Sequence, residues 1–199
     1  MNRELQQSGI SHTIFAAGDS NWFGNVAAPL AKSLEEVIPR HVGDIPVPVR
    51  QRMHRGAVND LVGFAVIGIT LFVTKKIADD FYDVVLKPRV RKCFEWLDDK
   101  LTGGNRKTQK VFVSNIWYQE HHVVESVAVV GKDFAEVVSH LNLLGSVHSN
   151  ALSWIAEHGV SAPVHHYKIE NGQVNAEPLL LERADEAVKP YRMPGQSPQ

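Results

Sequence analysis

Apolar residues recur along the N-terminal part of the chain in two successive patterns. Residues 13–17 form a short apolar run typical of a strand, and residues 25–38 repeat apolar positions at helical spacing. Pro29 falls in the first turn of that helix, where its missing N–H costs no hydrogen bond. We therefore predict an N-terminal βα unit, followed by an extended linker because Gly43, Pro46 and Pro48 oppose regular helix.

The middle of the chain contains its most apolar segment, an uncharged run over residues 61–73. We predict that this run opens a long helix, which is capped by Asn59 or Asp60 and runs to Leu86. The helix is apolar on every side up to residue 73, and beyond that point a single apolar stripe lies between charged residues. Pro88 is predicted to break or kink it and to open a second helix over 89–101.

The pattern changes to strands in the C-terminal half. Residues 111–118 and 121–130 are rich in β-branched and aromatic side chains, which predicts a β-hairpin. Residues 133–158 then repeat apolar positions at helical spacing, and Gly159 is a typical residue to end that helix. Asn171 and Gly172 favour a type I′ turn, which predicts a second hairpin and therefore a ββαββ module.

Together these elements predict an α+β protein with an N-terminal βα unit, a long central helix that is partly all-apolar, and a C-terminal ββαββ module of sheet plus helix. Residues 1–48 hold the βα unit with its extended linker, and residues 49–104 form a basic helical segment that contains the apolar helix. Residues 105–183 form the ββαββ module, and residues 184–199 are predicted to be a disordered tail.

The apolar run is too short for a clear membrane span. A bilayer core of about 30 Å needs about 20 apolar residues, whereas a helix over 61–73 covers roughly 20 Å. We expect the run to be buried in a soluble or oligomeric core. The alternatives are shallow or re-entrant insertion at an anionic membrane surface and a single membrane span.

Charge is distributed unevenly. Residues 50–110 carry 13 Lys and Arg against 7 Asp and Glu, whereas the rest of the chain carries 8 against 15. A basic segment of this kind favours anionic lipid or an acidic partner surface, while the acidic flanks disfavour nucleic acid. The single cysteine, Cys93, excludes an internal disulfide framework, and the N-terminus has no secretory signal pattern, so we expect a cytoplasmic protein.

The residues after the first predicted strand include Gly18-Asp19-Ser20, with Gly24 four residues after the serine. This segment resembles the first block of the GDSL (SGNH) hydrolases, and Asn59-Asp60 resembles the Asn-Asp pair that helps form their oxyanion hole. The resemblance implies a serine hydrolase with Ser20 as nucleophile and Asn59 as an oxyanion donor. The chain departs from that family because no Asp is followed three residues later by His, so the acid and base are missing.

Ten histidines include two adjacent pairs, His121-His122 and His165-His166, both in predicted strands. Neighbouring strand residues point to opposite faces, so one histidine from each pair would offer two metal ligands at most. We therefore expect histidines without metal, and we predict no cofactor.

These observations predict a non-catalytic interaction or assembly protein that binds a protein partner or a second copy of itself, with an anionic membrane surface as a further partner. The GDSL-like hydrolase and a membrane-anchored component with one span are the alternatives. The predicted contact surface consists of Leu61, Phe64, Ile67, Leu71, Phe72, Arg50, Arg52, Arg55, Lys75 and Lys76.

Overall fold

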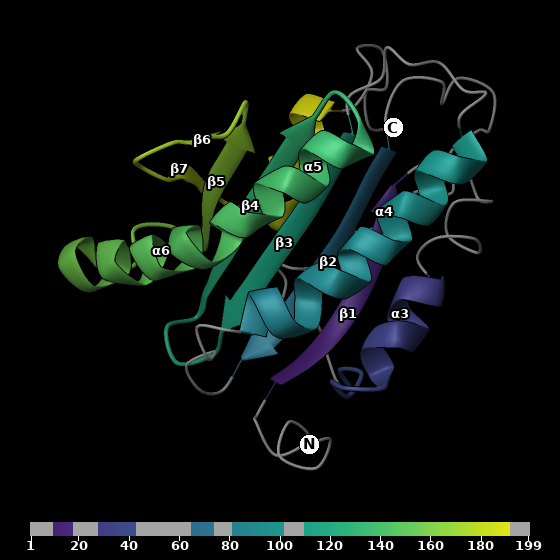
Figure 1. Cartoon of the computed structure of the whole chain (residues 1–199). Coiled ribbons are helices and arrows are strands. Elements are labelled where there is room, and N and C mark those ends of the chain that lie inside the picture. Colours follow the sequence, from purple (N-terminus) through teal and green to yellow (C-terminus); the bar gives the residue numbers. More distant parts are fainter. Residues whose placement is uncertain (1–9, 18–27, 43–64, 74–80, 102–109, 192–199) are drawn as a thin grey trace, which may run out of the picture.

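The computed structural model describes residues 10–17, 28–42, 65–73, 81–101 and 110–191, whose arrangement is shown in Figure 1. Its α-helices are α3 (Ala28–Glu35), α4 (Lys87–Leu101), α5 (Phe134–His140) and α6 (Leu144–His158). Three other helical segments are the π-helix η3 (Tyr82–Leu86) and the 3-10 helices η4 (Leu141–Leu143) and η5 (Ala184–Tyr191).

Seven strands form one mixed sheet, which confirms the predicted α+β class. They are β1 (Ile10–Ala17), β2 (Ala65–Val73), β3 (Lys110–Tyr118), β4 (Val123–Gly131), β5 (Val164–Glu170), β6 (Gln173–Val174) and β7 (Leu179–Leu181). The first six are neighbours in chain order, and β7 also pairs with β5. The pairs β2–β3 and β4–β5 are parallel, and each is connected through helices, as parallel strands require.

The four α-helices cover one face of the sheet (Figure 1), and the main core lies between these two layers. Ile69, Phe112 and Val127 contribute to this core from β2, β3 and β4. The opposite face carries a smaller apolar cluster in which Phe72 and Trp117 lie with Ala184 of η5. Successive strand residues point to opposite faces, so each central strand supplies both layers.

The predicted long central helix is wrong for residues 65–73, because they form β2, between β1 and β3. A strand that is buried on both faces reads as a continuous apolar run, and such a run cannot be distinguished from a buried helix by periodicity. The run is also rich in β-branched residues, which favour strands. The predicted helix is confirmed only near its end, where η3 leads directly into α4.

Most of the other predicted elements are confirmed with changed bounds. The first strand, the helix that contains Pro29, and the hairpin of β3 and β4 are all present. The single helix predicted over 133–158 is divided into α5, η4 and α6, and it ends at Gly159, whose φ is 75°.

The turn of the second hairpin is confirmed, whereas the disordered tail predicted after this hairpin is partly wrong. Asn171 and Gly172 have φ values of 52° and 72°, as the predicted type I′ turn between β5 and β6 requires. The disordered tail predicted from Ala184 is wrong for Ala184–Tyr191, because these residues form η5 and bury Ala184 and Ala187. The charged and proline-rich composition of residues 184–199 favours disorder, but Ala184 and Ala187 lie three residues apart and are buried on η5.

Candidate functional site

The structure describes few of the residues predicted to carry function. Ser20 and Asn59 lie outside the described residues, as do Leu61, Phe64, Arg50, Arg52, Arg55, Lys75 and Lys76. Ile67 lies in β2 and is the pairing partner of Phe112. Leu71 is fully buried and Phe72 is 2% exposed, with its ring stacked on His41 at 3.7 Å between centroids. Leu71 and Phe72 therefore belong to the interior and not to a contact surface.

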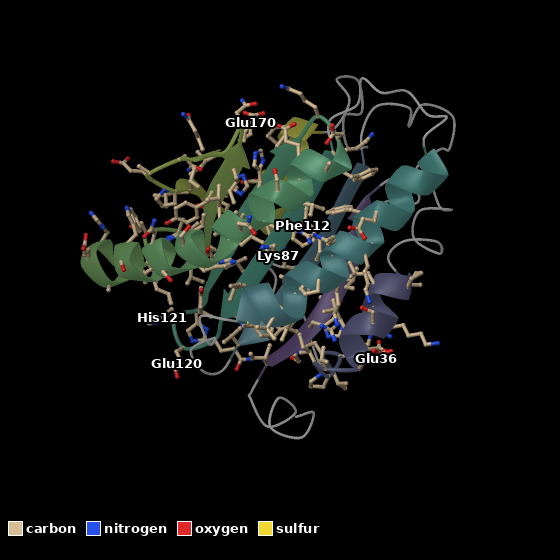
Figure 2. All side chains as sticks on the ribbon, viewed as in Figure 1. Glu36, Lys87, Phe112, Glu120, His121 and Glu170 are labelled. Atoms are coloured by element: carbon tan, nitrogen blue, oxygen red, sulfur yellow. The ribbon has the colours of Figure 1, made fainter. Side chains whose placement is uncertain are left out.

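The two histidine pairs differ in their surroundings. His121 and His122 belong to the turn between β3 and β4, so their predicted strand position is wrong. Figure 2 shows His121 at this outer end of the hairpin. His165 and His166 do lie in a strand, on opposite faces of β5. Within the described part of the chain, no hydrogen bond or ring contact joins one pair to the other.

The strongest polar feature of the interior surrounds Glu125 of β4, which is fully buried. Its Oε2 accepts a hydrogen bond from the Tyr118 hydroxyl at 2.9 Å, and its Oε1 is in direct contact with His148 Nδ1. His148 comes from the buried face of α6, and Tyr118 from the end of β3. This contact fixes the orientation of the His148 ring, because it determines that Nδ1 faces the carboxylate and that Nε2 faces away from it.

Sequence reasoning missed Glu125 and His148. The usable signal was Glu125 itself, the one charged residue in the strand sequence VVESVAVVG. A lone carboxylate in a strand that is buried on both faces must have polar partners, because an unpaired buried charge is very costly. The partner on α6 was not foreseeable, because it depends on how the helix packs on the sheet.

His165 and Tyr167 extend this polar cluster onto β5. His165 is the pairing partner of Glu125, and Tyr167 lies two residues further on the same face. Burial lowers the pKa of His165, although the negative charge of Glu125 acts in the opposite direction. Burial, together with Glu125, raises the pKa of Tyr167 to about 12. Both side chains are therefore neutral at neutral pH.

A second polar row crosses the opposite face of the sheet. Strand register places Thr13, Thr70, Asn115, Ser126 and His166 side by side on five consecutive strands. Asn115 Nδ2 donates to Thr70 Oγ1 at 3.4 Å, and His166 Nδ1 lies 3.3 Å from Ser126 Oγ. Burial lowers the pKa of His166 to about 4.

The low pKa of His166 predicts that the folded protein loses stability in acid. The unfolded chain protonates His166 below about pH 6.5, whereas the folded chain does so only below about pH 4. Stability should therefore fall as the pH decreases across this window, by up to about 3 kcal/mol from this residue. Urea unfolding between pH 7 and pH 4 should show a shallower loss for His166→Asn. The exposed-residue control His121→Asn should follow the wild type, and an equal slope for His166→Asn would refute the assignment.

The outer edge of the sheet beside β5 carries exposed leucines. Leu179 is 59% exposed and Leu180 is 43% exposed, and both belong to β7. Leu180 pairs with His165 and Leu179 pairs with His166, so they point to opposite faces of the sheet. In the described part of the chain, no strand pairs with β7 on its side away from β5.

Among the described residues, no group of three or more His, Cys, Asp or Glu side chains is arranged to hold a metal ion. The helices described here include none that is long and apolar enough to cross a membrane.

Similarity to known proteins adds no assignment to this geometry. No protein-family model matches the chain, and no match was found among curated proteins or among solved structures.

Proposed function

We propose that this chain is a non-catalytic interaction protein, and that its contact site is the exposed edge at β7. The observation that carries the proposal is the exposure of Leu179 and Leu180 on a strand whose outer edge is unpaired in the described structure. Exposed, apolar edge strands readily pair with another chain, so proteins usually protect them. A partner strand that pairs with β7 would place its own side chains beside Leu179 on one face of the sheet and beside Leu180 on the other.

The charge around β7 indicates what kind of partner fits. Residues 177–186 contain four acidic residues, Glu177, Glu182, Asp185 and Glu186, against the single basic residue Arg183. The charge of Arg183 is already matched locally, because its Nε donates to Asp185 Oδ1 at 2.8 Å. Two copies of this edge would repel each other, so the partner is an extended segment with apolar residues beside lysine or arginine. This encounter would take place in the cytoplasm, a location supported by the single cysteine, because chains in reducing compartments rarely carry disulfides.

Nuclear magnetic resonance titration tests this function. A short peptide of alternating lysine and valine should shift the backbone amide signals of residues 177–183 and of β5, and added salt should weaken the effect. A peptide of alternating glutamate and valine is the matched control and should leave these signals in place. The double variant Leu179→Ser, Leu180→Ser should lose the shifts. Val84→Ser should keep them, because Val84 is similarly exposed (54%) but lies on η3.

Three outcomes would contradict the proposal. The first is an unchanged spectrum at millimolar basic peptide, and the second is an equal response to both peptides. The third is self-association through β7, measured by light scattering and removed by the leucine variant, since it would replace the proposed partner by a second copy. In a separate arm, binding of the chain to phosphatidylserine vesicles with no response at β7 would favour contact of the basic segment 50–110 with a membrane surface.

A further inference from the structure

Three buried polar side chains on the helix-covered face of the sheet have atoms that bond to nothing in the described structure. They are both ring nitrogens of His165, the hydroxyl of Tyr167 and the hydroxyl of Ser114. All three residues are at most 2% exposed. Such atoms are rare in folded proteins, and each needs an explanation such as a bound molecule.

His165 and Tyr167 lie together at the edge of the cluster around Glu125. They are two residues apart on one face of β5, which separates their Cα atoms by roughly 7 Å. The ring of Trp154 on α6 meets His165 edge-to-face at 5.0 Å between centroids, and this ring contact can satisfy at most one of the two nitrogens. Trp154 is itself only partly buried, so its indole reaches from the His165 ring towards the surface of α6.

The charges around these two residues restrict the chemistry of a ligand. Neutral His165 offers one donor and one acceptor, and the Tyr167 hydroxyl offers both as well. An anion would be repelled by Glu125, whose charge acts on both residues. A cation would need the oxygens of Glu125, which already engage Tyr118 and His148. The surrounding aromatic rings favour a flat molecule.

We propose that His165 and Tyr167 bind a small, planar, neutral molecule that carries a hydrogen-bond donor beside an acceptor, as a primary carboxamide does. The molecule lies under Trp154, which moves aside to admit it. This site is independent of the partner contact at β7, although Leu180 pairs with His165 and lies beside it.

Nicotinamide is a suitable probe because nicotinate has the same shape and carries a negative charge. Nicotinamide should shift the Trp154 indole N–H and the His165 ring signals, and nicotinate should bind at least about tenfold more weakly. Tyr167→Phe should weaken nicotinamide binding by about tenfold, the effect of one lost hydrogen bond. In the free protein, Tyr167→Phe should leave the unfolding midpoint unchanged or raised, because its hydroxyl is unsatisfied. Tyr118→Phe should lower it, because that hydroxyl donates to Glu125.

The proposal is overturned if millimolar nicotinamide leaves the Trp154 and His165 signals unchanged. Detection of a long-lived water beside Tyr167, with no response to nicotinamide, would show that water satisfies the hydroxyl and would overturn the proposal as well. Equal binding of nicotinate would also overturn it, because the site would not select neutral molecules. Failure of the peptide titration at β7 with normal nicotinamide binding would refute the proposed interaction function alone.

Discussion

Replacing Leu71 by alanine should lower the free energy of unfolding by about 2–5 kcal/mol, the range for a truncated core leucine. Leu71 is fully buried in β2, inside the main core between the sheet and its helices. The cost combines the lost apolar burial with the cavity that remains, since a central strand cannot collapse to fill it. Urea unfolding of the variant measures the change directly.

Leu179→Ala is the matched control for this prediction, because it makes the same chemical change at a side chain that is 59% exposed. It should alter the free energy of unfolding by less than about 0.5 kcal/mol. If both variants lose similar stability, or if Leu71→Ala loses none, the position of Leu71 in the core is wrong.

Replacing Glu125 by alanine should cost about 2–5 kcal/mol, because each buried donor that loses its acceptor costs about 1–3 kcal/mol. The substitution removes the acceptor of the Tyr118 hydroxyl and the carboxylate beside His148, while both remain buried. Glu125→Gln keeps the size and one acceptor oxygen, so it should cost less than the alanine variant. Thermal or urea unfolding of the two variants gives the comparison.

An exposed glutamate supplies the control for Glu125. Glu120 lies in the turn after β3, at the outer end of the hairpin (Figure 2), and Glu120→Ala should leave stability nearly unchanged. A loss below about 1 kcal/mol for Glu125→Ala would show that the carboxylate does not hold the cluster together.

Local sequence signals predicted the elements of this fold that depend on local chemistry. Asn171 and Gly172 define their turn through backbone conformations that few other residues adopt, and Pro29 identified the start of α3. β-Branched and aromatic residues predicted the hairpin of β3 and β4. These features need no knowledge of distant parts of the chain.

The errors concern features that only the tertiary structure decides. Residues 65–73 carry no charge and are mostly apolar because they lie in an internal strand between β1 and β3, and residues 68–73 are buried. The run itself shows neither its neighbouring strands nor the cover on its faces. The cluster around Glu125 likewise brings together β3, β4, β5 and α6, whose side chains are up to 49 positions apart between Tyr118 and Tyr167. The candidate sites were therefore missed, although the class of the fold was predicted correctly.

Residues 65–73 form an internal strand, and the arrangement of the sheet and of its two faces depends on the position of this strand. Backbone carbon chemical shifts and amide hydrogen exchange of the full chain in solution test it most directly. The structure predicts strand-type shifts over this segment, together with exchange as slow as that of β3 and β4. Helical shifts over residues 65–73, or exchange as fast as that of the exposed turn at His121, would contradict it.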